Sequence, residues 1–125
     1  MTKRIQKVVL AVAALALAAA AGPAQAPKKT PELVSKGKAS YETNCATCHG
    51  AKGRGDGDAA VALDPKPRNL VADAFKRGAG VVQVYETLGK GIDGTTMVSF
   101  GHLPDDERWA LAYYVLELRG GKAKK

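Results

Sequence analysis

The chain has 125 residues, of which 46% are hydrophobic, and a formal net charge of +7 from 19 Lys and Arg against 12 Asp and Glu. The excess positive charge lies near the two ends, because residues 31–119 hold 11 basic and 12 acidic side chains. Proteins that bind nucleic acid gather cationic side chains on one surface, so this distribution gives that class no support. The length fits one domain, which we expect at 31–121, followed by a basic tail at 122–125.

The first 26 residues have the three parts of a secretory signal: a basic start, an apolar stretch at 8–21 and an Ala-Gln-Ala cleavage site at 24–26. The apolar stretch is shorter than the roughly 20 residues that a membrane span needs. We therefore expect export to the periplasm as a soluble protein, with a polar linker at 27–30. Pro27 disfavours cleavage directly before it, so an uncleaved anchor stays open as the alternative, and membrane contact is expected only in that case.

Residues 31–44 are predicted to form the first helix, because Thr30 suits an N-cap and Pro31 suits the first helical position. One face of this helix is expected to be buried, with apolar or small residues at helical spacing: Leu33, Val34, Gly37 and Tyr41. Gly37 is a poor helix former, so its place mid-helix indicates a second helix that crosses closely there. Simple tolerance of a glycine is the alternative.

Both cysteines of the chain lie in the pentapeptide Cys-Ala-Thr-Cys-His at 45–49. The pattern C-x-x-C-H is the attachment signature of a c-type haem. Cys45 and Cys48 can each add to one haem vinyl group, and the His49 imidazole can reach the iron. Zinc is less favoured, because His102 is the one further histidine and a closed structural zinc site needs four ligands. A redox dithiol is expected beside a β-α-β pattern, which this sequence lacks.

Two irregular segments and a helix are predicted next. Residues 50–58 are too rich in glycine for regular structure and are expected to wrap around the haem edge. They lack the G-K-[ST] ending of a phosphate-binding loop. Residues 64–68 contain two prolines and are predicted to be a second loop. Residues 81–88 carry the apolar stripe of an amphipathic helix, which Gly89 and Gly91 are expected to end.

The last helix is predicted to begin near Pro104, with acidic residues at its positive N-terminal end, and to finish at Gly120-Gly121. Its buried stripe is expected to contain Trp109, Ala112, Tyr113 and Leu116. The sequence shows no β alternation and no internal repeat. The domain is therefore predicted to be all-α, with three to four helices.

The Cys-Ala-Thr-Cys-His motif follows a helix that carries Gly37 and Tyr41, and a methionine stands 48 residues after the histidine. An aromatic C-terminal helix completes the pattern. Over residues 33–119 the chain resembles the class I, mitochondrial-type cytochromes c of bacteria. The strings G-x-G-D-G, P-K-P-R-N-L and G-T-T-M-V-S-F are similar to those of small periplasmic monohaem members.

The resemblance implies the class I cytochrome c fold, wrapped around one haem c that both cysteines of the motif hold covalently. It implies His49 as the proximal iron ligand and Met97 as the distal one. It also implies that the carbonyl of Pro67 accepts the ring N–H of the proximal histidine and that Leu70 packs on the haem. Val98 is a departure, because relatives commonly have proline directly after the ligand methionine.

Residue chemistry separately favours Met97 over His102 for the sixth iron position. Met97 lies among small residues in a predicted loop, whereas His102 adjoins a helix start. His/Met ligation is the cytochrome c pattern that raises the reduction potential. We therefore expect a monomeric, extracytoplasmic one-electron carrier that docks transiently with a redox donor and acceptor. The alternatives are a haem subunit of a larger oxidoreductase and, if the sixth position is open, a ligand-binding haem sensor or peroxidase.

Overall fold

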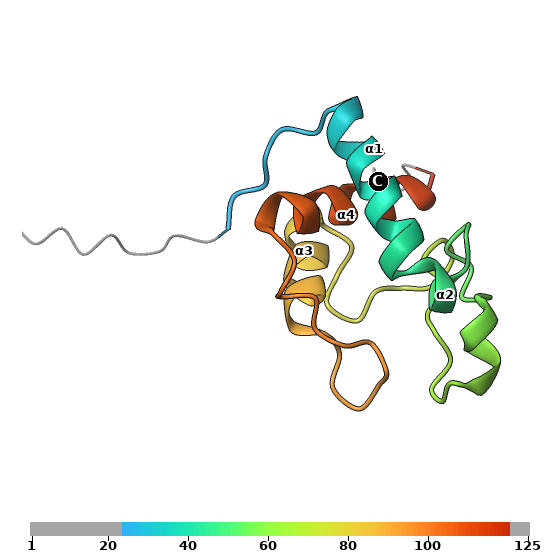
Figure 1. Ribbon diagram of the computed structural model, residues 1–125. Helices are drawn as coiled ribbons and strands as arrows, with labels where there is room; N and C mark the ends of the chain where they lie inside the picture. The colour runs from blue at the N-terminus through green and yellow to red at the C-terminus, as the bar shows by residue number, and fades with distance from the viewer. Residues whose placement is uncertain (1–23, 121–125) are drawn as a thin grey trace, which may run out of the picture.

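The computed structural model describes residues 24–120 (Figure 1). It contains four α-helices: α1 at Pro31–Asn44, α2 at Ala46–His49, α3 at Val81–Lys90 and α4 at Asp105–Leu118. A short 3-10 helix, η1, covers Asp58–Ala62. The described part of the chain contains no β-strand, so the predicted all-α class is confirmed. The predicted signal at 1–26, except for its last three residues, and the basic tail at 122–125 lie outside the described residues.

The start of α1 follows the sequence-based expectation. The backbone N–H of Leu33 donates to Thr30 Oγ1 at 3.1 Å, so this hydroxyl satisfies one of the free N–H groups at the helix start. The preceding linker lies against α4, where the Pro27 carbonyl accepts a hydrogen bond from the Tyr113 hydroxyl at 2.6 Å. No helix within residues 24–120 is long and apolar enough to cross a membrane.

Helix α1 crosses α4 (Figure 1). Gly37 lies at the point of close approach, as the sequence indicated. A Cβ atom added at this glycine would lie 2.0 Å from the carbonyl oxygen of Ala110 and 2.9 Å from Cβ of Tyr114. The backbone of α4 therefore occupies the space that a side chain would need. The close crossing, rather than tolerance of a glycine, explains the residue at this position.

Replacement of Gly37 by alanine is expected to lower the free energy of unfolding. The better helix propensity of alanine favours the variant by about 1 kcal/mol, whereas overpacking a closed site costs about 1–3 kcal/mol. The clash involves backbone that cannot rotate away, so the cost lies at the upper end of that range and we expect a net loss of about 2 kcal/mol. Thermal or denaturant unfolding of the haem-loaded protein measures this loss, with Ser35→Ala on the exposed side of α1 as the control. A Gly37→Ala protein as stable as that control would contradict the crossing.

The buried face of α4 differs from the predicted stripe. The buried residues of α4 are Trp109, Ala110, Leu111, Ala112 and Val115. Tyr113 and Leu116, which the periodicity selected, are half-buried. The reason is that α4 packs against both α1 and α3, and nearly every position from 109 to 116 is apolar. In such a sequence several faces of the helix are equally apolar. The positions of the neighbouring helices therefore decide which face is buried.

The end of α3 also differs slightly from the prediction, because Gly89 lies within the helix, which continues to Lys90. Gly91 ends α3 in the left-handed backbone region, with φ of 70°. A Cβ atom there would lie 2.8 Å from backbone atoms of Met97, Val98 and Ser99. The glycine therefore lets the chain fold back along the helix it has just left.

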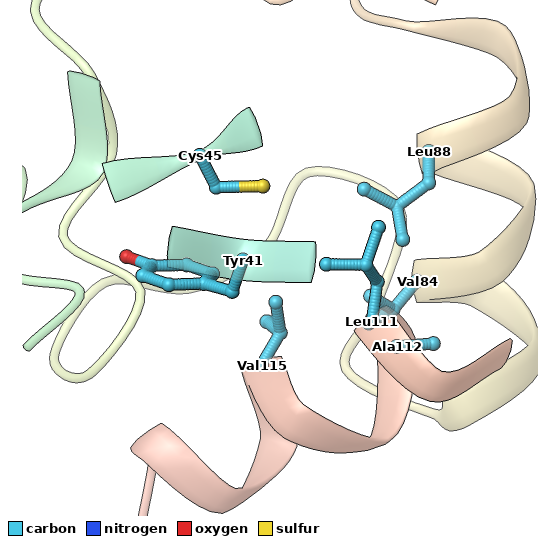
Figure 2. Close-up of a cluster of buried hydrophobic side chains, with 7 residues drawn as sticks. All are labelled: Tyr41, Cys45, Val84, Leu88, Leu111, Ala112 and Val115. Atoms are coloured by element: carbon cyan, nitrogen blue, oxygen red, sulfur yellow. The ribbon is translucent and has the colours of Figure 1, made fainter. Parts of the chain in front are cut away.

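The core lies where α1, α3 and α4 meet (Figure 2). Seven buried residues form this core: Tyr41, Cys45, Val84, Leu88, Leu111, Ala112 and Val115. The sulfur of Cys45 points in among these side chains in Figure 2. The cysteine that ends α1 thus belongs to the core and to the C-x-x-C-H motif at once.

Candidate haem-binding site

A cavity of about 580 Å³ opens beside this core. Its walls come from α1, α2, α3, α4 and two loop segments at 65–78 and 92–100. All six residues that the sequence assigned to the site line it: Cys45, Cys48, His49, Pro67, Leu70 and Met97. Residues that lie up to 52 positions apart in the sequence are therefore brought to one place by the fold.

One turn of backbone presents the two thiols and the imidazole. The N–H of Cys45 donates to the Tyr41 carbonyl at 2.8 Å at the end of α1, and the N–H of His49 donates to the Cys45 carbonyl at 2.9 Å in α2. Residues three and four positions apart share one helical face, so Cys45, Cys48 and His49 face the cavity together. Burial, with a smaller contribution from Cys48, raises the pKa of the Cys45 thiol to about 12. Burial therefore disfavours the thiolate form of Cys45, and the thioether that this sulfur would form with a haem is uncharged.

The ring of His49 is oriented by a backbone carbonyl. Its Nδ1 lies 3.0 Å from the carbonyl oxygen of Arg68. Because a carbonyl only accepts, Nδ1 carries the proton and Nε2 is the nitrogen left to bind a metal. Burial lowers the pKa of this imidazole from 6.5, and the hydrogen bond to Arg68 opposes that shift. The ring is therefore neutral at pH 7, the state that can ligate iron.

The predicted hydrogen bond from His49 to the Pro67 carbonyl is wrong, because the acceptor is the next residue, Arg68. The Pro67 carbonyl faces the glycine-rich loop, where a Cβ atom on Gly55 would lie 2.6 Å from its oxygen. Pro67 still lines the cavity with its own atoms. The sequence places a proline-rich loop here but contains no signal that selects one carbonyl over its neighbour.

The glycine-rich loop packs closely on the C-x-x-C-H turn, but none of its residues 50–58 lines the cavity, so its wrapping around a haem edge stays a prediction. The N–H of Gly57 donates to the Cys48 carbonyl at 3.1 Å, and a Cβ atom at this glycine would lie 2.2 Å from the Thr47 carbonyl oxygen. The Gly53 carbonyl accepts from the N–H of Leu70 at 2.7 Å. The loop therefore joins the turn that carries the thiols to the wall that carries Leu70.

Met97 is held at the cavity by a tight loop. The N–H of Ile92 donates to the Met97 carbonyl at 2.9 Å, and the N–H of Met97 donates to Thr95 Oγ1 at 3.0 Å. Thr95 Oγ1 in turn donates to the Ile92 carbonyl at 2.7 Å. These bonds order the loop without the proline that Val98 replaces. His102, the other candidate for the sixth position, is exposed and lies outside the cavity lining.

Several wall residues were not singled out from the sequence, among them Phe75, Arg77, Ile92 and Phe100. The two phenylalanines stand in loops, and an aromatic residue outside any amphipathic stripe is the signal that would have found them. The lining combines two thiols, an imidazole and a thioether with apolar side chains, and it also includes charged ones such as Arg77. Thiols for attachment, an imidazole and a thioether for ligation are the donor set that a haem c requires, so the residues present fit this group. No group of three His, Cys, Asp or Glu side chains that could hold a metal ion occurs within residues 24–120.

Comparison with known proteins identifies the family of this chain. The model of the family described as cytochrome c matches residues 34–119. The chain belongs to the cytochrome c family. Its predicted membership among monohaem-type cytochromes c and its all-α cytochrome c fold are confirmed. As a member of this family, the domain is a haem-iron protein of electron transport.

Two curated relatives are subunits of cbb3-type cytochrome c oxidases. The CcoP subunit of Azospirillum brasilense is 33% identical over 70% of this chain and 29% of its own length. The FixP subunit of Rhizobium meliloti (strain 1021) is 32% identical over 78% of this chain and 32% of its own length. This cytochrome c thus spans about a third of these relatives.

A solved structure of the reducing HAO-like protein complex of Kuenenia stuttgartiensis is also similar. It has a TM-score of 0.71 and 36% identity, and the match covers 75% of this chain and 47% of that one. The similarity therefore extends to the arrangement of the helices as well as to the sequence.

Proposed function

We propose that this cytochrome c is a periplasmic one-electron carrier with one covalently attached haem c and His/Met axial ligation. The observation that carries the proposal is the convergence of His49 and Met97, from two separate segments, on the cavity that both thiols line. Two axial ligands leave no iron position for a substrate. That ligand set favours electron transfer over ligand chemistry.

Each residue has a distinct part in this function. A haem supplies the one-electron chemistry when bound, and the chain supplies attachment, orientation and environment. Cys45 and Cys48 hold the group, while the Arg68 carbonyl keeps His49 in the tautomer that ligates. The soft thioether of Met97 favours ferrous iron and so raises the reduction potential. The apolar walls exclude water and keep the surroundings similar in both oxidation states.

One haem per chain should remain attached when the protein is denatured. Both thiols of the motif line the cavity, so we expect acid-acetone treatment to leave the haem on the polypeptide in a denaturing gel. The pyridine haemochrome spectrum should indicate two saturated vinyl groups. A Cys48→Ser variant should retain the haem through one thioether and show one unsaturated vinyl group, whereas His102→Ala should behave as wild type. Haem that extracts freely from the wild-type protein would exclude covalent attachment.

A haem domain docked on a larger oxidoreductase is the second candidate. Its support is that the two curated relatives are subunits of cbb3-type oxidases and that the match covers only about a third of each. The two candidates differ in their assembly. Purification from the native source with mild detergent distinguishes them, since a carrier that docks transiently is recovered as a monomer and a subunit is recovered with its complex.

A further inference from the structure

Arg119 lies directly after α4 and contacts a segment far earlier in the chain. Its Nη1 donates to the carbonyls of Leu70 at 2.8 Å and Asp73 at 2.9 Å, which are 49 and 46 residues away. Its guanidinium carbon lies 4.4 Å from the centroid of the Phe75 ring. One side chain therefore engages two carbonyls and one aromatic face of the same segment.

That segment, residues 68–75, forms part of the haem cavity. Leu70 and Phe75 line the cavity, and the carbonyl of Arg68 accepts the hydrogen bond from the ring of His49. A displacement of the segment would therefore change both an apolar wall and the group that orients the iron-ligating imidazole.

Hydrogen bonds within the segment make it behave as one unit. Arg68 Nη1 donates to the Ala74 carbonyl at 2.6 Å. The N–H of Asn69 donates to Asp73 Oδ2 at 3.0 Å, and the N–H of Asp73 donates to the Asn69 carbonyl at 2.9 Å. Because the turn is closed on itself, its position depends on the contacts that join it to the rest of the protein. The two hydrogen bonds from Arg119 Nη1 and its stack on Phe75 make the directional connection to α4.

We propose that Arg119 is a positioning residue for the proximal histidine. By holding segment 68–75 on the end of α4, it sets the geometry of the hydrogen bond from His49 Nδ1 to the Arg68 carbonyl. The inference rests on the proposed ligation of iron by His49. Partners of this kind raise the basicity of a ligating imidazole. A loosened segment should therefore weaken the donor bond to ferric iron and raise the reduction potential.

Arg119→Lys tests this role while keeping the positive charge. Lysine is a point charge on a flexible chain and cannot reproduce the planar stack on Phe75 that holds Nη1 against the two carbonyls. We expect the His49 Nδ1 proton to exchange with solvent roughly tenfold faster in the ferrous haem-loaded variant, measured by NMR, and the reduction potential to rise. The slowest amides of α1 and α4 should exchange as in wild type. Arg54→Lys, at an exposed arginine of the glycine-rich loop, should change neither quantity.

An unchanged Nδ1 exchange rate in Arg119→Lys would overturn the inference. Equal acceleration of the Nδ1 proton and the core amides would overturn it too, because it would assign Arg119 to general stability. If Arg119→Lys does not fold, Phe75→Leu removes the stack while keeping an apolar wall, and the same comparison applies to it. A wild-type NMR spectrum without a haem-shifted His49 ring would instead refute the proposed ligation itself.

Discussion

Replacement of Met97 by alanine is expected to open the haem iron to external ligands and to lower the reduction potential. Met97 lines the cavity in a loop closed by hydrogen bonds through Thr95 and Ile92, and removal of its thioether leaves nothing soft to stabilise ferrous iron. Axial ligands set haem potentials over roughly 0.8 V, and we expect a decrease on the order of 0.1 V. Replacement by histidine should also lower the potential, while keeping six ligands.

Carbon monoxide binding to the ferrous protein measures the opening of the sixth position. Carbon monoxide can bind only after Met97 dissociates, so its apparent affinity is reduced in proportion to the fraction of protein in which the sixth position is open. If about 1% of the wild-type protein is open, it would bind carbon monoxide roughly a hundredfold more weakly than Met97→Ala. His102→Ala is the matched control, because this residue is exposed and lies outside the cavity lining. If the wild-type protein binds carbon monoxide as readily as Met97→Ala does, the sixth iron position is open. The hypothesis of a ligand-binding sensor or peroxidase would then replace that of an electron carrier.

Without haem, the chain is expected to lose most of its helical structure. Five of the seven core residues also line the haem cavity: Tyr41, Cys45, Val84, Leu88 and Val115. Empty cavity volume costs roughly 24 cal/mol per Å³, so a dry cavity of this size would cost on the order of 10 kcal/mol. That cost is comparable to the whole stability of a small domain, about 5–15 kcal/mol. Water entering an open cavity reduces the cost but exposes the apolar walls instead.

Circular dichroism of a Cys45→Ser, Cys48→Ser double variant made in the periplasm tests this dependence on haem. We expect low helix content and no cooperative melting. Cys48→Ser alone, which keeps the buried attachment thiol, should retain both the haem and the fold. Native-like helicity and a cooperative transition in the haem-free double variant would show that α1, α3 and α4 are stable by themselves.

The bounds of the helices were largely predictable because the signals are local. Thr30 and Pro31 begin α1, and the predicted end at Asn44 is the observed one. The close crossing at Gly37 was also predictable, since a glycine inside a helix lowers stability unless a neighbouring element needs the space that a side chain would fill. The buried face of α4 was not, because an apolar run from 109 to 116 leaves the choice of face to α1 and α3.

Part of the candidate site was likewise predictable from the sequence, and part was not. A five-residue motif is sufficient to predict Cys45, Cys48 and His49 as site residues, because attachment and ligation would come from adjacent positions on one helical turn. Whether Met97 reaches the same cavity depends on a loop that returns along α3, and backbone hydrogen bonds set that path. The acceptor for the imidazole was predicted one residue too early, since neighbouring carbonyls are chemically identical and differ only in direction.

The amino-acid sequence by itself therefore determined the family and the all-α class, and it predicted the covalent part of the haem site from residue types at short and constant spacing. The tertiary structure alone decided which carbonyl orients His49 and which side of α4 is buried. It alone brought Arg119 onto a segment 46 and 49 residues earlier. These features depend on the direction of backbone groups and on contacts between distant segments, and no periodicity or motif in a sequence encodes either.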